Sequence, residues 1–191
     1  MKKVLFYPGT FNPPHFGHTS AVIVALEKIT FDEVWIMPSG KRVDKEISTS
    51  LQDRKNMSSI LVEYLQSLTD IPIKLLADAL EENNTKYTHE IIVEPKERSG
   101  CEIYQLVGID GYLGIKERVI GPNEKFIVIE RLGHEFPKSI KPNDNLIILS
   151  EKVEGISSTL IRDMVKCGND EYKKLVPEKI ALYIKDSGLY L

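Results

Sequence analysis

Two histidines, His15 and His18, lie three positions apart in a short loop rich in proline and glycine. The apolar run at 4–7 predicts a buried strand, and Pro8-Gly9 ends it. After His18 the apolar residues recur at helical spacing, so the loop is predicted to lead into a helix. The first amides of a helix have no partners within it, and its dipole favours negative charge. Two imidazoles beside such a helix start suit a phosphate that gains charge during a reaction.

The residues around these histidines form a signature. Gly9-Thr10-Phe11-Asn12-Pro13 precedes His15-x-Gly17-His18, and together they resemble the HxGH signature of the nucleotidyltransferase superfamily. Far along the chain, residues 156–162 read ISSTLIR and resemble the second signature of that superfamily, ISSTxxR. Two matches in the right order are more specific than either alone, and a strand–loop–helix context supports the first. The alternative is that both histidines are only turn residues of a proline-rich loop.

The composition is that of an ordinary globular domain. At 191 residues the chain is long enough to bury a full core as one domain. Lys and Arg number 25 against 28 Asp and Glu, and the net charge of -3 predicts no general attraction to nucleic acid or acidic membranes. Cys101 and Cys167 have no CxxC partner and are predicted to be reduced and buried.

The apolar run that ends at Pro8 is too short for the core of a signal peptide. No stretch of the sequence has the length of a membrane span. The cytoplasm is therefore the predicted location.

Strand-like and helix-like segments alternate along the chain. Predicted strands after the first lie at 33–37, 71–76, 102–107, 126–129 and 146–149. Predicted helices lie at 88–96 and 111–119, and others begin near Ser50, after Ser157 and at Pro177. The pattern predicts the α/β class: a single Rossmann-like domain over residues 1–191, with a parallel sheet and helices on both faces. The closing helices, at about 157–187, are predicted to pack on the sheet.

In such a sheet, ligands bind at the carboxyl ends of the strands, where the strand order reverses. The candidate residues that follow predicted strands are the segment 9–18, Lys41, Arg42, Asp110 and Arg131. Residues 157–159 open a predicted helix, whose start offers free amides and hydroxyls to a phosphate. Less specific readings remain open: helix capping for Ser157, a solvated loop for Lys41 and Arg42, and a surface ion pair for Arg162.

Further segments are similar to one family of this superfamily, the bacterial nicotinate-nucleotide adenylyltransferases. Residues 108–110 match its GxD, and residues 86–88 resemble its SYT segment. Residues 126–131 resemble its fifth strand and the arginine after it, and residues 176–190 resemble its closing segment. The resemblance implies that the protein joins ATP and nicotinate mononucleotide to give deamido-NAD and pyrophosphate. The family's tryptophan that stacks on the pyridine ring is absent between Asp110 and Arg131. Tyr112 or Tyr87 would have to take its place.

The implied reaction needs no covalent intermediate. The acceptor phosphate is already ionised and attacks the α-phosphorus of ATP in line, so catalysis consists of positioning and charge stabilisation. The resemblance assigns catalytic roles to His15, His18 and Thr10. It assigns ATP binding to Gly9, Thr10, Phe11, Gly17, His18, Asp110, Ile156, Ser157, Ser158, Thr159 and Arg162. It assigns acceptor binding to Asn12, Lys41, Tyr87, Thr88, Tyr112 and Arg131.

Magnesium (Mg2+) is expected to come with ATP and to be bound mainly through the nucleotide and water, because the sequence shows no cage of carboxylates. The predicted partners are small-molecule nucleotides, ATP and a pyridine mononucleotide, with no nucleic acid and no membrane. A homo-oligomer is left open.

Two other functions stay open. A different adenylyl- or cytidylyltransferase of the same superfamily would keep the catalytic residues and use another phosphate acceptor. A nucleotide sensor without catalysis would bind ATP and release no pyrophosphate. The intact His15, Gly17 and His18 argue against the sensor.

Overall fold

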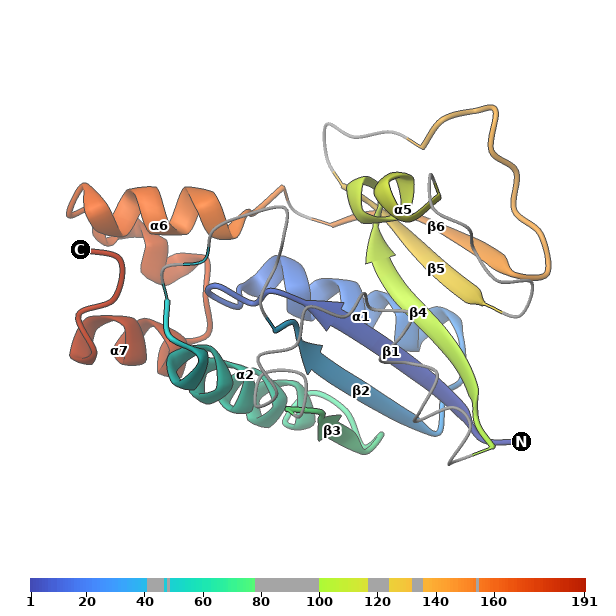
Figure 1. Cartoon of the computed structure of the whole chain (residues 1–191), viewed down its shortest axis with the longest axis horizontal. Helices are drawn as coiled ribbons and strands as arrows, with labels where there is room; N and C mark the ends of the chain where they lie inside the picture. Colours follow the sequence, from blue (N-terminus) through green and yellow to red (C-terminus); the bar gives the residue numbers. More distant parts are fainter. Residues whose placement is uncertain (41–46, 48, 78–99, 117–123, 132–135, 154) are drawn as a thin grey trace.

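The computed structural model describes the whole chain except residues 41–46, 48, 78–99, 117–123, 132–135 and 154. Its strands form one sheet, which is drawn in Figure 1 with its flanking helices. The strands are β1 (Lys3–Gly9), β2 (Glu33–Pro38), β3 (Ile73–Leu75), β4 (Glu102–Gly108), β5 (Lys125–Arg131) and β6 (Leu146–Val153). The helices of the described residues are α1 (Phe16–Lys28), α2 (Leu51–Gln66), α5 (Ile109–Lys116), α6 (Ser158–Lys166), the short 3-10 helix η1 (Asp170–Lys174) and α7 (Glu178–Asp186).

The strand order of the sheet is β3-β2-β1-β4-β5-β6, and every neighbouring pair is parallel. The chain builds outward from β1 through β2 to β3, and then returns to the other side of β1 to add β4. Phe6 of β1 accordingly pairs with Trp35 on one side and with Gln105 on the other. The order therefore reverses between β1 and β4, which is where an open α/β sheet binds its ligand. The predicted Rossmann-like parallel sheet is confirmed.

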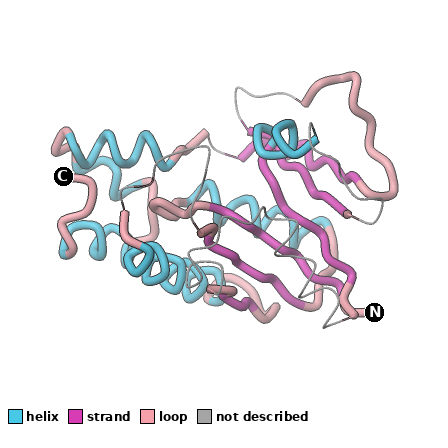
Figure 2. The backbone as a smooth tube through the Cα atoms, viewed as in Figure 1, coloured by secondary structure: helices cyan, strands magenta, loops and turns pink. Residues whose placement is uncertain are grey.

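Side chains that alternate along β1 pack on opposite faces of the sheet. Leu5 and Tyr7 belong to the largest apolar cluster, to which α1 and α2 contribute Val22 and Leu61. Val4 lies in a separate cluster on the opposite face. On this second face α5 packs against β5, so the predicted covering of both faces by helices is confirmed (Figure 2).

The closing helices form a cluster of their own beside the end of β1 (Figure 1). Ile161 of α6 and Ile180 of α7 are fully buried there, together with Met57 of α2. Phe16, the first residue of α1, packs against the same cluster. Through Phe16 and Met57 the cluster contacts α1 and α2. Packing of the closing helices on the sheet itself stays a prediction.

Several element ends differ from the predictions, because tertiary contacts decide them. Helix α1 begins at Phe16 rather than at His18, and Pro177 is the residue before α7 rather than its first residue. Helix α2 ends at Gln66, and Leu68 beyond it is half exposed, although its apolar side chain has the spacing that would continue the buried face of the helix. Cys101 is buried as predicted, whereas Cys167 is exposed because it ends α6 on the outer side.

Other differences concern whole segments. Helix η1 was not predicted. Helix α5 begins at Ile109, two residues before its predicted start. The predicted helix at 88–96 and the end of the one at 111–119 lie outside the described residues.

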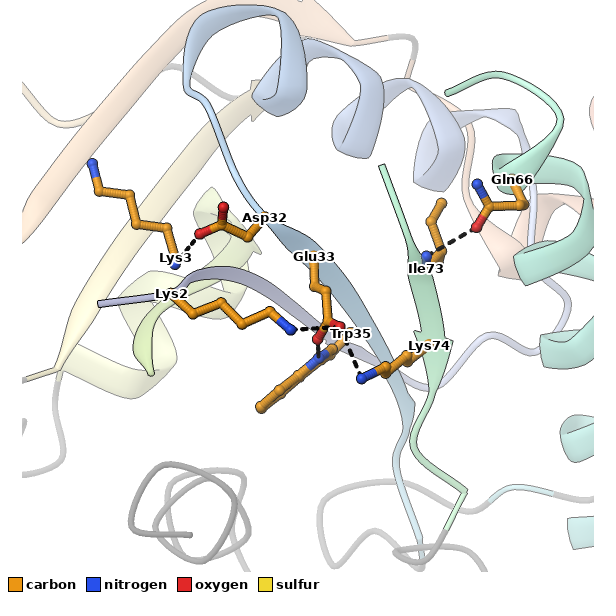
Figure 3. Close-up of polar contacts among 8 residues, drawn as sticks. All are labelled: Lys2, Lys3, Asp32, Glu33, Trp35, Gln66, Ile73 and Lys74. Carbon is orange, nitrogen blue, oxygen red and sulfur yellow. Dashed lines mark hydrogen bonds and ion pairs between the residues drawn. The ribbon is translucent and has the colours of Figure 1, made fainter. Parts of the chain in front are cut away.

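A buried carboxylate ties the first three strands together near the starts of β1 and β2 (Figure 3). Glu33 accepts from the Lys2 ammonium at 2.6 Å, the Lys74 ammonium at 2.8 Å and the Trp35 indole N–H at 2.8 Å. Burial alone would raise the pKa of the Glu33 carboxyl, but these hydrogen bonds outweigh burial and lower the pKa to about 2. The network lies at the amino ends of the strands, away from the edge where ligands bind in such sheets.

Candidate active site

The loop after β1 begins with a close approach between two residues. Phe11 has a φ of +48°, in the left-handed region, and its ring folds back over Gly9. A Cβ at Gly9 would lie 2.7 Å from the Phe11 ring, so only glycine fits at this position. The Phe11 ring is 1% exposed and meets the His18 ring edge-on, with centroids 5.1 Å apart. Phe11, which is predicted to bind ATP, therefore packs against His18, which is predicted to bind ATP as well.

The two histidines of the signature stack on each other, with ring centroids 3.7 Å apart. The backbone N–H of His15, which precedes the first turn of α1, donates to Nδ1 of His18 at 3.2 Å. Because Nδ1 accepts this hydrogen bond, the proton of the neutral ring sits on Nε2. The outer nitrogen of His18 is thereby a donor, which is the property needed to bind a phosphate oxygen.

The start of α1 is also held by the closing part of the chain. The backbone N–H of Phe16 donates to the Leu175 carbonyl at 2.9 Å, between η1 and α7. One of the first-turn amides that the sequence offers to an anion is therefore already occupied. The helix dipole and the two histidines remain at this end of α1.

The second signature opens α6 and reaches back to the loop. Ser157 caps α6 by accepting from the Leu160 N–H at 3.1 Å, so its predicted capping role is present. Ser158 donates its hydroxyl to the Pro13 carbonyl at 2.9 Å. Arg162 donates Nη1 to the Asn12 carbonyl at 2.8 Å. The structure therefore joins the two signatures, which are about 150 residues apart in the sequence.

Arg162 makes a second hydrogen bond, from Nη2 to the Thr159 hydroxyl at 3.0 Å. Its guanidinium is half-buried at the point where α6 meets the loop. Ile156, which precedes the cap, is buried in the cluster of the closing helices and anchors the start of the signature.

Asp110 occupies the first turn of α5, directly after β4, and is exposed. Strands β1 and β4 are neighbours, so the loop with the histidines and Asp110 lie at the same edge of the sheet. Tyr112 on the same helix is only 6% exposed, and its ring packs against Phe126 and Phe136. Its role as a stacking partner stays a prediction.

Other predicted residues are placed only in part. Arg131 ends β5, but its side chain is outside the description. Four residues lie outside the described ranges altogether, and they are Lys41, Arg42, Tyr87 and Thr88. Within those ranges, no three His, Cys, Asp or Glu side chains come together in a group suited to a metal ion.

A buried arginine, Arg54, is a residue that the sequence analysis does not predict. Arg54 of α2 is 2% exposed and donates Nη1 to the Ser39 carbonyl at 2.6 Å, just after β2. Burial lowers the pKa of its guanidinium, which nevertheless stays charged at neutral pH. The signal was available, because Arg54 lies three and seven positions before Met57 and Leu61 and so shares their apolar face.

Tyr190, in the segment after α7, is a second residue of the site that the sequence analysis does not predict, because the spacing of apolar residues says nothing about its contact. Its hydroxyl donates to Oδ1 of Asn12 at 2.7 Å across 178 residues of sequence. Asn12 therefore receives hydrogen bonds from two closing elements, through its side chain and through its backbone carbonyl.

Comparisons with known proteins find similarity to the same family that the sequence motifs resemble. A protein from Clostridium tetani described as a probable nicotinate-nucleotide adenylyltransferase is 28% identical over the full length of both chains. A Lactiplantibacillus plantarum protein with the same description is 29% identical over 99% of this chain and 88% of its own length. The fold matches that of Plasmodium falciparum nicotinic acid mononucleotide adenylyltransferase complexed with NaAD, with a TM-score of 0.78 and 24% identity over 100% of this chain and 98% of that one.

The family comparison covers most of the sequence. The cytidylyltransferase-like family model matches residues 6–164, a range that contains both signatures, the end of β1 and the whole of β2 to β6. This match, together with the hydrogen bonds that join the signatures, confirms the predicted superfamily. The chain belongs to the cytidylyltransferase-like family of nucleotidyltransferases.

Proposed function

We propose that the protein is a nicotinate-nucleotide adenylyltransferase, which joins ATP and nicotinate mononucleotide to give deamido-NAD and pyrophosphate. The observation that carries this proposal is the segment of residues 9–18, which runs from the end of β1 into the first turn of α1. In it His18 presents Nε2–H, while the second signature holds the segment through Ser158 and Arg162. The full-length relatives from bacteria, described as probable enzymes of this activity, support the choice of acceptor. The cytoplasm, where ATP is regenerated, is the proposed compartment.

The proposed mechanism is a direct in-line transfer. An oxygen of the acceptor's phosphate attacks the α-phosphorus of ATP, a P–O bond forms, and the bond to the β-phosphate breaks to release pyrophosphate. The nucleophile is an ionised phosphate, so no side chain has to remove its proton. The enzyme contributes orientation and stabilises the charge that develops on the α-phosphate oxygens.

On the ATP side, His18 and Thr10 donate to the α-phosphate, and the stacked His15 keeps His18 in place. Gly9, Phe11 and Gly17 give the loop the shape that this contact requires. Asp110 accepts from ribose hydroxyls at the end of β4. The β- and γ-phosphates are bound at the start of α6, by the segment 156–159 and by Arg162, whose guanidinium is already held beside the loop.

On the acceptor side, Asn12 contacts the phosphate of the mononucleotide. The remaining proposed contacts to this substrate are made by Lys41, Tyr87, Thr88, Tyr112 and Arg131. A carboxylate offers only acceptors, whereas a carboxamide adds an NH2 donor. A pocket of donors therefore selects nicotinate over nicotinamide, because unpaired buried donors cost about 1–3 kcal/mol each.

Magnesium is brought to the enzyme by ATP, as the Mg2+–ATP complex. The lack of a clustered set of carboxylate or imidazole ligands among the described residues fits an ion bound through phosphates and water. When bound, the ion neutralises charge on the phosphates, while the protein residues named above orient them.

The test measures pyrophosphate release and the nucleotide product with ATP and a panel of acceptors. We expect deamido-NAD from nicotinate mononucleotide, with kcat/KM about 10- to 100-fold above that for nicotinamide mononucleotide. If the enzyme prefers another phosphate acceptor, the proposed acceptor is wrong, and if it prefers CTP to ATP, the proposed donor is wrong. In both cases the proposed nucleotidyl transfer stands. ATP binding without pyrophosphate release with any acceptor would make the protein a nucleotide sensor.

No helix of the described residues is long and apolar enough to cross a membrane.

A further inference from the structure

Tyr190 reaches the catalytic loop from the far end of the sequence. Its hydroxyl lies 2.7 Å from Oδ1 of Asn12 and 3.8 Å from Sδ of Met57. Its backbone has a φ of +68°, a left-handed conformation that residues other than glycine rarely adopt. Gly188 precedes it with a φ of +59°, which turns the chain after α7 back towards the loop. An unfavourable backbone conformation at Tyr190 is therefore maintained where its hydroxyl meets Asn12.

The hydroxyl of Tyr190 is a donor over the whole range of pH in which enzymes work. Burial raises the pKa of this phenol well above its ordinary value, although Thr49, Arg162 and Arg54 each act to lower it. The phenol therefore keeps its proton and donates a hydrogen bond to Oδ1 of Asn12.

This hydrogen bond sets the orientation of the Asn12 side chain. A side-chain amide has an acceptor oxygen on one side and an NH2 donor on the other. Because Oδ1 faces Tyr190, the Nδ2 group faces the opposite way. The backbone carbonyl of Asn12 accepts from Arg162 as well, so both oxygens of Asn12 are engaged by the closing segments. What Asn12 can present to a ligand is a donor, which suits a phosphate oxygen.

We propose that Tyr190 is a positioning residue that holds the Asn12 amide with its NH2 group directed at the phosphate of the acceptor nucleotide. The proposal rests on the proposed function, and it adds a residue from outside both signatures. Without the Tyr190 hydroxyl the amide is free to turn, and a turned amide places its oxygen against an anionic phosphate. The expected loss therefore falls on the acceptor and spares ATP.

Tyr183 provides a matched control for the loss of a tyrosine hydroxyl. It belongs to α7, donates to Oδ1 of Asp53 at 2.9 Å and accepts from Nδ2 of Asn56 at 2.8 Å. Both of these partners lie on α2, so the Tyr183 hydroxyl joins α7 to α2 rather than to Asn12. Tyr183→Phe and Tyr190→Phe thus remove the same group, each from a hydrogen bond that joins the closing part of the chain to the rest of the domain.

The experiment compares the two variants with the wild-type enzyme. For Tyr190→Phe we expect the KM of nicotinate mononucleotide to rise about five- to tenfold, with the KM of ATP changed less than twofold. Tyr183→Phe should change neither KM, and both variants should show a similar shift in Tm. In an Asn12→Ala background, adding Tyr190→Phe should cause no further loss, because the group that it positions is gone.

Two results would overturn the role of Tyr190: equal kinetic effects of both tyrosine variants, or additive effects of Tyr190→Phe and Asn12→Ala. The NMR signals of the Asn12 side-chain amide provide a readout that does not need turnover. They should move in Tyr190→Phe and stay unchanged in Tyr183→Phe. If the wild-type enzyme prefers another phosphate acceptor, the proposed function fails, while the same comparison with that acceptor and the NMR signals still decides the role of Tyr190.

Discussion

At the scale of single residues, the donor on His18 is the product of a backbone contact. The His15 N–H occupies Nδ1, which leaves Nε2 to carry the proton of the neutral ring, and we propose that this N–H donates to the α-phosphate. The neighbouring rings of His15 and Phe11 restrict the imidazole from two sides. A donor fixed in this way stabilises developing charge without first having to reorganise.

His18→Ala should therefore lower kcat by roughly 10²–10³, the range for removal of one preorganised donor. The Tm should change little, because the side chain is only half-buried and lies in the first turn of α1, outside the apolar clusters. Steady-state kinetics and a thermal melt measure both effects. Near-normal turnover would contradict the role assigned to this histidine.

Arg162 should show the reverse of the pattern expected for Tyr190. Arg162→Ala removes a charge partner of the triphosphate, so the KM of ATP should rise about 10- to 100-fold and exceed the rise for the acceptor. Arg162→Lys keeps the charge and loses the fork that bonds Asn12 and Thr159 together, so it should recover only part of the affinity. Equal changes in both KM values would favour a purely structural role.

At the scale of elements, α2 connects the end of β2 with the closing helices. Arg54 bonds the Ser39 carbonyl after β2, while Met57 one turn later packs in the cluster of α6 and α7. The capping of α2 follows from its sequence, because the Asp53 N–H donates to the Ser50 hydroxyl as the spacing predicts. Burial disfavours the charge of Arg54, so its guanidinium needs the hydrogen bonds that it donates to the carbonyls of Ser39 and Gly40.

Arg54→Ala should destabilise the protein by about 2–4 kcal/mol, because it leaves a cavity and removes the donor to the partly buried Ser39 carbonyl. Gln52→Ala, on the exposed side of the same helix, should stay within about 0.5 kcal/mol of the wild type. Urea unfolding of both variants measures the difference. An Arg54→Ala variant as stable as Gln52→Ala would show that the hydrogen bond to Ser39 does not stabilise the fold.

The fold could be predicted from the sequence because its signals are local. The apolar run before Pro8, the helical spacing after His18 and the alternation of strands and helices identify a parallel α/β sheet without knowledge of contacts. The candidate site could be predicted only in part. Its signatures name the loop and the start of α6, but no pattern links Tyr190 to Asn12, because that contact depends on how the chain turns after α7.

At the scale of the whole molecule, stability and chemistry lie at opposite ends of the strands. The segment with His15 and His18 follows the carboxyl end of β1. The Glu33 network joins the strands near their amino ends (Figure 3). Substitutions in the network should therefore alter unfolding more than kinetics.

The Glu33 network should make stability depend on pH in the acid range. The native pKa of about 2 lies below the ordinary value of 4.5, so the native state favours the ionised carboxyl. This contribution, about 1–3 kcal/mol, is fully present above about pH 5 and is lost as the pH falls towards 2. Urea midpoints of wild type and Glu33→Gln should therefore differ at pH 7 and converge near pH 2–3.

Glu63→Gln serves as the control for this pH dependence, because Glu63 pairs with Lys179 at 2.9 Å on the exposed surface. Its stability should follow that of the wild type at every pH. A constant gap between wild type and Glu33→Gln down to pH 2 would contradict the low pKa of Glu33.

The hydrogen bonds that hold Asn12 span 150 and 178 residues, and this separation has a consequence for synthesis. The histidine loop leaves the ribosome long before the helices that support it. At about 5–20 residues per second, the loop waits roughly 9–36 s for Tyr190 to be translated. A nascent chain thus carries both histidines well before the closing helices can hold them in place. We therefore expect nucleotidyl transfer to begin only after translation has supplied these helices.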